Sequence, residues 1–409
     1  MNVPKLRFKE FNDKWKPINL ANTFQYFSTN SFSREQLSES GILKNLHYGD
    51  IHRKYNSIVN ENKDITSYIK DINYVNKYEL LKNNDLIFAD ASEDYEGIGK
   101  AVEVVNVNNN TVSGLHTILA RDNSNVFAPM FKGYYFNSPI VHNQVRVLAN
   151  GFKVYGISRD SINKLNIRIP SIQEQSKIAN TLYLLDKKIE LQTKKIEDLK
   201  LFKKGLINIL NKKSYQETTL GKIGKFQTSS IDKLVKENEK IVNLYNYMDV
   251  YKHKIIMTQD LSKLSKTSAK DNQIITNNLK RGDILFTPSS ETPDDIGHSI
   301  CIQENLPNTV YSYHLLRYRP NIIIDPLFSN YYFNNSKIRK QIIRYATGAT
   351  RYTVSLDNFL KIKVDIPDLI TQKKYGLLLY STDKKVNKEM FKLNKLQELK
   401  KGLMQDMFV

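Results

Sequence analysis

The sequence has a single cysteine, Cys301, among its 409 residues. One thiol excludes a disulfide framework and any metal cluster held by several thiolates, and it suits a reducing compartment such as the cytoplasm. Apolar runs of the roughly 18–20 residues that a membrane-spanning helix needs are also missing, and the mean hydropathy is -0.47. Because the first residues are charged and lack an apolar segment, we expect no secretory signal and a cytoplasmic protein.

Sequence patterns of common nucleic-acid enzymes are missing as well. Without any Pro-Pro dipeptide, the chain lacks the Asp/Asn-Pro-Pro-Tyr/Phe loop of methyltransferases that act on amino groups of bases. The Gly-Lys pairs that begin at Gly99, Gly221 and Gly224 are not followed by the Ser or Thr of a phosphate-binding loop. The seven histidines show no zinc-binding spacing. We therefore expect no catalytic residue and no metal site in this chain.

Acidic residues are few relative to basic ones. The 42 Asp and Glu residues stand against 61 Lys and Arg, which gives a net charge of +19. Such an excess is typical of proteins that bind nucleic acid. The alternative is a basic protein from an AT-rich genome. With 18 Phe and 24 Tyr the chain can fill hydrophobic cores, and its length suits two or three domains.

The chain repeats itself. A shift of 197 residues aligns 170–210 with 367–407 without a gap, and 14 of the 41 positions are identical. Shifts of 198 and 199 residues align Asp85 with Asp283 and Tyr48 with Tyr247. Self-similarity over such a period indicates two copies of one structural unit, about 1–212 and 213–409. The polar stretch 211–216 is the natural linker between them.

Each copy ends in a predicted long helix. Apolar residues recur there at steps of three and four for about five heptads, which is typical of a coiled-coil seam. Polar residues interrupt both seams at the same places, Gln192 with Glu389 and Lys203 with Lys400, so we expect the two helices to pair with each other. The predicted pairing residues are Ile178, Leu182, Leu185, Ile189, Ile196, Leu199, Leu206, Leu379, Val386, Leu393, Leu396 and Leu403.

The rest of each copy has the pattern of a globular domain. Short runs such as 85–89 and 360–364 are wholly apolar or alternate with polar residues, as half-buried strands do. Loops rich in Asn, Ser and Gly separate them. The expected fold class is α+β: two tandem mixed α/β domains, each followed by a long helix, with the two helices paired as an antiparallel coiled coil.

This organisation resembles the specificity subunit of a type I restriction-modification enzyme over essentially the whole chain. The family's long helix begins near Ile-Pro and a later Gln, as at Ile169-Pro170 and Gln175, and continues with Leu-Asp-Lys-Lys-Ile and Lys-Lys-Gly-Leu, as at 185–189 and 203–206. The opening Pro-x-Leu-Arg-Phe at 4–8 is similar too. The second copy departs from the pattern at 370–371.

The resemblance implies target recognition domains at 1–170 and 214–366 and spacer helices at 171–213 and 367–409. It implies that each domain reads one half of a bipartite, asymmetric target in double-stranded DNA. The helices would dock two methyltransferase subunits, and restriction/translocase subunits would join the full complex. S-adenosylmethionine, ATP and Mg would be bound by these partners and none by this chain. The alternative is a coiled-coil protein-protein adaptor without sequence-specific DNA binding.

Loops at matching positions of the two copies are the candidate DNA contacts, since both copies should present the same face to DNA. For each loop the alternative is that it bonds its own backbone, and Asp85, Asp283, His116 and His314 suit fold maintenance equally well. The candidates in the first copy are Ser28, Thr29, Asn30, Ser31, Arg34, Tyr48, His52, Arg53, Ser92, Glu93, Tyr95, His116, Lys153 and Tyr155. Those in the second copy are Thr228, Ser229, Ser230, Tyr247, Tyr251, Lys252, Ser290, Glu291, Thr292, His314, Thr350, Arg351 and Tyr352.

Overall fold

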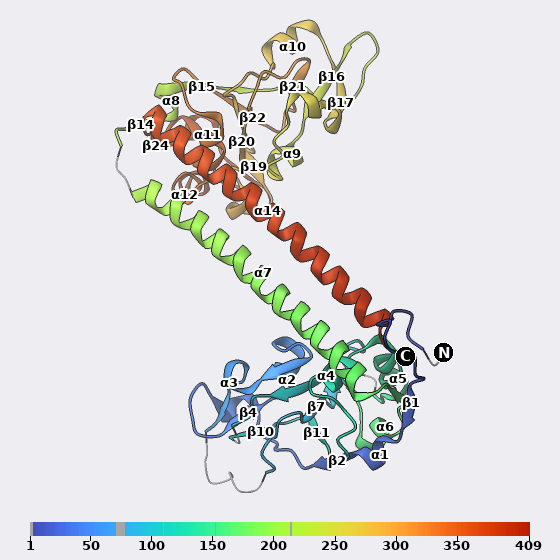
Figure 1. The fold of residues 1–409 in the computed structure, drawn as a ribbon. Helices are drawn as coiled ribbons and strands as arrows, with labels where there is room; N and C mark the ends of the chain where they lie inside the picture. Colours follow the sequence, from blue (N-terminus) through green and yellow to red (C-terminus); the bar gives the residue numbers. More distant parts are fainter. Residues whose placement is uncertain (1–2, 71–77, 109, 152, 213–214) are drawn as a thin grey trace. The chain divides into compact units, whose positions relative to one another are not determined.

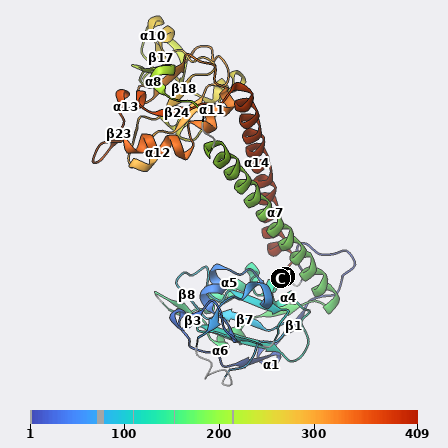
Figure 2. The ribbon, with the colours of Figure 1, turned by 90° about the vertical axis from the view of Figure 1, so that its left-hand side faces the viewer.

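The computed structural model describes residues 3–70, 78–108, 110–151, 153–212 and 215–409, so part of the predicted linker lies outside the described residues (Figures 1 and 2). Contacts divide the chain into two compact units, Met1–Lys194 with Phe391–Val409, and Lys195–Met390. The domain boundaries predicted from the sequence separate each long helix from the globular domains. In the structure, each compact unit combines one globular part with segments of both long helices. Within the described ranges, no helix is long and apolar enough to cross a membrane.

The first unit is built on a five-stranded sheet in the order β2-β11-β7-β9-β5. A second sheet has the order β10-β4-β6-β3, and two short pairs, β1-β13 and β12-β8, complete the unit. The strands are β1 (Lys16–Ile18), β2 (Phe24–Phe27), β3 (Leu37–Ser38), β4 (Lys44–Leu46), β5 (Ile58–Asn60), β6 (Tyr68–Ile69), β7 (Leu86–Ala89), β8 (Ala91–Ser92), β9 (Ala101–Val105), β10 (Thr111–Ser113), β11 (Thr117–Asp122), β12 (Tyr155–Gly156) and β13 (Ile167–Ile169).

The second unit repeats this plan with a four-stranded sheet, β15-β22-β18-β20, and a three-stranded sheet, β17-β16-β21. The pairs β14-β24 and β19-β23 match the two short pairs of the first unit. The strands are β14 (Glu217–Thr219), β15 (Gly224–Thr228), β16 (Lys240–Tyr245), β17 (Ser265–Ala269), β18 (Ile284–Phe286), β19 (Ser289–Ser290), β20 (Ser299–Cys301), β21 (Thr309–Tyr311), β22 (Leu316–Pro320), β23 (Tyr352–Thr353) and β24 (Lys363–Asp365).

The strand orders show that the internal repeat is a repeat of structure. Four antiparallel neighbours, β2-β11-β7-β9, match β15-β22-β18-β20, and the parallel pair β10-β4 matches the parallel pair β21-β16. The predicted α+β class with two tandem mixed domains is confirmed. The strand predicted at 85–89 is confirmed as β7. All four of its residues, Leu86–Ala89, are buried, because both faces of the sheet are covered at this strand, and this explains why its sequence is wholly apolar.

Short helices cover the sheets in both units. Those of the first unit are α1 (Leu20–Thr23), α2 (Tyr48–Arg53), α3 (Glu61–Asp64), α4 (Phe131–Tyr135), α5 (Pro139–Leu148) and α6 (Arg159–Asn163). Those of the second unit are α8 (Leu220–Ile223), α9 (Tyr247–Tyr251), α10 (Asp271–Thr276), α11 (Pro326–Tyr332), α12 (Ser336–Arg344) and α13 (Leu356–Leu360).

The two long helices are α7 (Ile172–Lys212) and α14 (Leu369–Asp406), and each has a buried glutamine in its first turn. The Gln175 amide donates to the Pro170 carbonyl at 3.0 Å, and the Gln372 amide donates to the Pro367 carbonyl at 2.7 Å. Their side-chain oxygens accept from backbone N–H groups of the preceding domain, at 2.9 Å for Ala128. The Pro–Gln pattern therefore attaches each helix to the domain before it.

The long helices pack against each other in both units, in antiparallel directions. The start of α7 meets the end of α14 in the first unit, where Lys400 pairs with Asp186 at 2.5 Å. The end of α7 meets the start of α14 in the second unit, where Lys203 pairs with Asp383 at 2.6 Å. The predicted pairing of the helices is confirmed, although the sequence did not identify the aspartates. All the predicted seam positions are buried or half-buried.

The ends of the helices also complete the hydrophobic cores. Ile178 and Leu182 of α7 lie in the first core together with Met407 and Phe408, which follow α14. The Phe408 ring stacks on Tyr135 with 5.4 Å between the ring centroids. The first domain is therefore closed by residues that the sequence places about 400 positions from its beginning.

Candidate nucleic-acid interface

The predicted loops of the first unit lie in one row along its surface. The Thr29 hydroxyl donates to the carbonyl of Thr117 at 3.1 Å, which places the 28–31 loop beside the start of β11. The preceding residue, His116, has its ring 5.2 Å from the Tyr48 ring in a T-shaped arrangement. The structure thus connects three loops that are far apart in the sequence.

The row continues from α2 into the loop after β8. The His52 ring nitrogen Nε2 lies 2.9 Å from the carbonyl oxygen of Ala91. Strand β8 then pairs with β12, which sets Ser92 opposite Tyr155. The Tyr155 ring lies 5.2 Å from the ring of Tyr95, which is exposed. Aromatic, imidazole and hydroxyl groups are therefore gathered on one strip, as sites that contact base edges require.

The second unit builds an equivalent row. The Ser229 hydroxyl donates to the Tyr311 carbonyl at 2.6 Å, and the neighbouring Tyr313 has its ring 3.9 Å from that of His314. Burial, together with the charges of Arg351 and Lys233, lowers the pKa of His314. The imidazole is thus neutral near pH 7, with one donor and one acceptor nitrogen.

Ser289 is the centre of the remaining contacts in the second unit. Its carbonyl accepts from the Tyr247 hydroxyl at 2.9 Å, and its hydroxyl accepts from the Arg351 guanidinium at 3.3 Å. The next residue, Ser290, stands opposite Tyr352 in the β19-β23 pair. The structure therefore brings together α9, β19 and the 347–353 hairpin.

Two glycines shape the hairpins that carry the outermost residues of these rows. Gly151 and Gly348 have φ of +127° and +142°, and a Cβ on either would lie 2.0 Å from a backbone oxygen, of Val154 and Arg351 respectively. Only glycine fits such a turn. The hairpins hold Lys153 and Arg351 exposed to solvent.

The predicted contacts differ in how accessible they are. The exposed ones are Ser28, Ser31, Arg34, Arg53, Glu93, Tyr95, His116, Lys153, Thr228, Ser230, Lys252, Glu291, Thr292, Thr350 and Arg351. The half-buried ones are Thr29, Tyr48, His52, Tyr155, Ser229, Tyr247, Tyr251, His314 and Tyr352. The exposed and half-buried candidates stay predictions of DNA contact.

Three candidates are buried, and the expectation for them is corrected to a role inside the fold. Asn30 is 3% exposed, and its amide donates to Asn45 at 2.7 Å and to the Ser113 carbonyl at 2.9 Å. Ser92 accepts from a backbone N–H two residues on, and the Ser290 hydroxyl donates to a carbonyl two residues on. Asn and Ser bond their own loops in this way, so these groups are already used.

Arg34 and the paired aspartates also have internal partners. The Arg34 guanidinium donates to both carboxylate oxygens of the buried Asp50 in α2, at 3.0 and 3.1 Å. Asp85 and Asp283 each accept two bonds from an arginine on the neighbouring strand, Arg121 at 2.8 Å and Arg319 at 2.6 Å. Bidentate pairs of this kind fix strand positions, which favours fold maintenance for the two aspartates.

Sequence reasoning missed a hydrogen-bonded chain beside the second row. His298 joins His253 through ring nitrogens 3.2 Å apart, and its other nitrogen lies 3.0 Å from the Asp295 carboxylate. Burial lowers the pKa of both histidines, and the nearby Arg339 lowers them further. No repeat signal could have found these residues, because the matching positions of the first copy hold other residue types.

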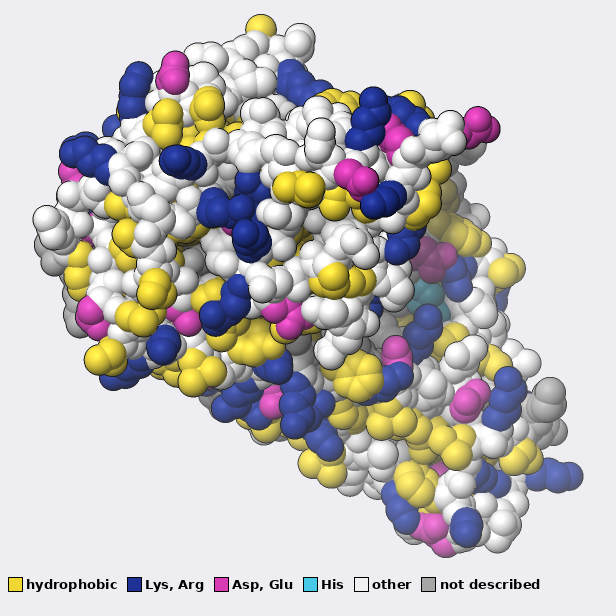
Figure 3. All heavy atoms as spheres, turned by 90° about the horizontal axis from the view of Figure 1, so that it is seen from above, with side chains coloured by type: hydrophobic (Ala, Val, Ile, Leu, Met, Phe, Trp, Pro, Cys, Tyr) yellow, Lys and Arg dark blue, Asp and Glu magenta, His cyan; other side chains and the backbone are white. Residues whose placement is uncertain are grey.

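Charge on the surface agrees with an anionic partner. Figure 3 shows lysine and arginine side chains spread over one face among polar and hydrophobic ones, with fewer acidic side chains between them. No group of three or more His, Cys, Asp or Glu side chains that could hold a metal ion occurs among the residues that the structure describes.

Comparisons with known proteins agree with this arrangement. Residues 12–201 match the family described as the type I restriction modification DNA specificity domain. The putative type I restriction enzyme MjaX specificity subunit of Methanocaldococcus jannaschii is 22% identical over 376 residues, which are 83% of this chain and 82% of that protein.

Two solved structures share the fold. The S subunit of a type I restriction-modification system from M. genitalium has a TM-score of 0.58 at 16% identity, over 100% of this chain and 99% of that one. A chain from work on complex assembly and conformational transition of the type I R-M system has a TM-score of 0.51 at 12% identity, over 95% and 96% of the two chains. Residues 12–201 thus match a type I restriction modification DNA specificity domain, and the whole chain is similar in sequence to a type I specificity subunit and in fold to S subunits of such systems.

Proposed function

We propose that this chain is the non-catalytic DNA-reading subunit of its complex and that each globular part reads one half of a bipartite, asymmetric target. One observation carries the proposal: the same row of loops occurs twice, on two copies of one fold, with different side chains. DNA-reading proteins with two identical halves bind palindromes. Two related halves with different contact residues suit two different half-sites.

Some positions of the two rows are shared and others differ. Tyr48 matches Tyr247, and Glu93 matches Glu291, whose carboxylates could accept from a cytosine amino group. At other positions the chemistry changes, as where the exposed Val154 of the first hairpin stands for Arg351 of the second. The shared residues suit contacts that both half-sites have in common, and the differing ones suit readout of different bases.

The outer faces of the long helices support the docking of methyltransferase subunits. Leu184 and Leu191 are 66% and 69% exposed on α7 and lie seven residues apart, two turns along one face. Phe202 and Ile209 repeat this spacing further along the same helix, and both are 51% exposed. Two apolar pairs on one helix suit two protein partners, because exposed apolar stripes mark interaction sites.

Catalysis is then a property of the partners. We assign S-adenosylmethionine to the two methyltransferase subunits and ATP and Mg to the restriction/translocase subunits. The purified chain, incubated with DNA, Mg²⁺, ATP and S-adenosylmethionine, is expected to give neither cutting nor methylation. Either product would refute the non-catalytic assignment.

Methylation mapping of the host genome tests the reading function directly. A split motif with two different halves should be methylated, and it should lose methylation when the gene for this chain is deleted. An adaptor without sequence-specific DNA binding would leave every methylated motif in place. The purified chain should also bind random duplex DNA with a steep dependence on salt.

A further inference from the structure

A cationic pocket lies beside the candidate interface of the first unit, where the loop after β8 meets the end of α14. Its volume is about 270 Å³. The residues that line it include Ser57, Glu96, Lys100, Asn137, His142 and Lys400. Two lysines thus face the same space, and Glu96 is already paired with Arg146 at 2.5 Å.

Lys100 keeps a donor available, whereas Lys400 is already paired with Asp186 at 2.5 Å. Two of the three N–H groups of the Lys100 ammonium donate to carbonyls at the end of α2, His52 at 3.2 Å and Tyr55 at 2.7 Å. The third remains for a ligand in the pocket. Burial and the positive charge of Lys400 lower the pKa of Lys100, and in the described structure the Lys100 ammonium bonds carbonyls and no carboxylate. An anion in the pocket would stabilise the charged form of Lys100.

The second unit carries basic residues at the same place. A shift of 197 or 198 residues places Arg339 at the position of His142, His298 at that of Lys100 and Lys203 at that of Lys400. His298 bonds His253 at 3.2 Å, and the charges of Arg339 and Lys203 both lower the pKa of His253. The residue types differ between the copies: Lys203 is paired with Asp383 and burial lowers the pKa of His298, so Arg339 is the cation of the second cluster that corresponds in role to Lys100.

We propose that each of these two clusters binds one phosphate of the DNA backbone beside its half-site. This proposal rests on the proposed DNA-reading function and adds that these residues bind backbone phosphates at the interface. The pocket adjoins the row of candidate contacts directly, since Lys100 holds the end of α2 and Glu96 follows Glu93 and Tyr95 in one loop. Phosphate contacts set the position of a protein on the duplex without reading bases. This explains why the cations recur although the readout residues differ.

Salt dependence of DNA binding counts such contacts, because each phosphate contact adds about 0.9 to the slope of log K against log salt. In the full-length chain on random duplex DNA, Lys100→Gln and Arg339→Gln should each lower the slope by about one, and the double variant by about two. Lys100→Arg, which keeps the charge, should retain the wild-type slope. The methylated motif in cells should stay the same for all variants.

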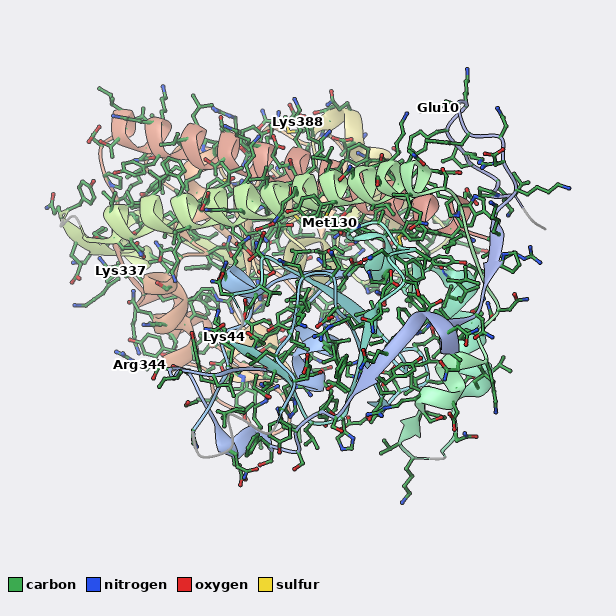
Figure 4. All side chains as sticks on the ribbon, turned by 60° about the horizontal axis from the view of Figure 1, so that its bottom comes forward. Glu10, Lys44, Met130, Lys337, Arg344 and Lys388 are labelled. Carbon is green, nitrogen blue, oxygen red and sulfur yellow. The ribbon has the colours of Figure 1, made fainter. Side chains whose placement is uncertain are left out.

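Lys44 provides a matched control. This lysine is buried in β4, where its ammonium donates to the Glu61 carbonyl at 3.0 Å, and it is labelled in Figure 4. Lys44→Gln removes a carbonyl-bound lysine as Lys100→Gln does, but it should leave the slope unchanged. Thermal unfolding of each variant checks that it is folded at the assay temperature.

The outcomes separate this inference from the proposed function. If the wild-type chain binds DNA and Lys100→Gln and Arg339→Gln keep its slope, the phosphate clusters are refuted while the reading function stands. If the slope falls equally in Lys44→Gln, the inference is refuted as well, because the loss then follows from damage to the fold. If the wild-type chain does not bind DNA, the proposed function itself fails.

Discussion

The ammonium of Lys203 lies 2.6 Å from one carboxylate oxygen of Asp383 and 2.8 Å from the other, which joins α7 to α14 in the second unit. Lys400 and Asp186 form the equivalent pair in the first unit. The lysine comes from α7 in one unit and from α14 in the other. Each helix therefore contributes one cation and one anion, and both pairs depend on the antiparallel direction.

Exchange of these charges should test the register of the helices. Asp383→Lys places two cations together and should destabilise the protein, whereas the double variant Asp383→Lys with Lys203→Asp should recover part of the loss. Contacting pairs couple by about 0.5–3 kcal/mol, and we expect about 1 kcal/mol for this half-buried pair. Urea unfolding measures it. The same exchange at the exposed pair Lys187 and Glu190 should change stability by less than about 0.5 kcal/mol. Equal effects at both pairs would contradict the assignment.

The seam between the helices can be distinguished from their outer face. Leu199→Asp with Leu396→Asp puts charge into half-buried seam positions and should abolish assembly with the methyltransferase subunits, since buried unpaired charge is strongly unfavourable. Leu191→Asp changes an exposed position, so it should weaken assembly without lowering the unfolding temperature. Co-purification and thermal unfolding give both readouts. Normal assembly of the double variant would refute the paired helices.

Arg351 tests readout by the second domain. Its guanidinium is exposed and bonds only the Ser289 hydroxyl in the described structure, so Arg351→Ala should fold normally. Loss of a guanine contact should relax one position of the motif at a cost of about 1–3 kcal/mol, whereas loss of a phosphate contact should weaken binding to all sequences. Binding assays and methylation mapping distinguish these. Unchanged affinity with an unchanged motif would remove Arg351 from the interface.

The fragment 1–212 should form a dimer of two identical halves. It contains Asp186 and Lys203, so in an antiparallel pair each copy supplies the lysine for the aspartate of the other. Such a dimer, with its methyltransferase partners, should modify an interrupted palindrome made of the first half-site. Light scattering reports the mass and methylation mapping the motif. A strictly monomeric fragment, or methylation of the original asymmetric site, would contradict equivalence of the two halves.

The same fragment should be less stable than the whole chain, for an identifiable reason. It lacks 391–409, and the internal repeat places Asn211 where Phe408 packs in the first core. Asn211→Phe in the fragment should restore the aromatic contact with Tyr135 and raise the unfolding temperature of the dimer. Lys204→Phe, at an exposed position of the same helix, is the control and should not stabilise it.

Acidification should destabilise the second unit. Burial lowers the pKa of His253 and His298 from the ordinary value of 6.5, so the unfolded chain binds more protons than the folded one at mildly acidic pH. Stability from these groups is complete above pH 6.5 and is lost as the pH falls below it. Unfolding followed from pH 7.5 to 5.5 should show this loss. His298→Gln should flatten the dependence, and an unchanged curve would contradict the assignment.

Periodicity and self-similarity were sufficient to predict the architecture from the amino-acid sequence. The heptads of 178–210 and their counterparts at 375–407 predicted two pairing helices, because an apolar stripe of that length must be buried by something equally long. The matched loops identified which segments would gather, since two copies of one fold place equal positions on equal faces.

Tertiary structure alone decided which of the matched side chains are accessible and what they touch. Asn30 and Arg34 belong to polar loops of the kind that binds DNA, yet the fold uses them to bond Asn45 and Asp50. A partner that lies far away in the sequence leaves no local pattern around a polar residue. The side chain can form the same hydrogen bonds with a DNA base as with another part of the protein, so its residue type does not show which of the two it binds. The pocket at Lys100 and Lys400 likewise exists only because antiparallel helices return the end of the chain to the first domain.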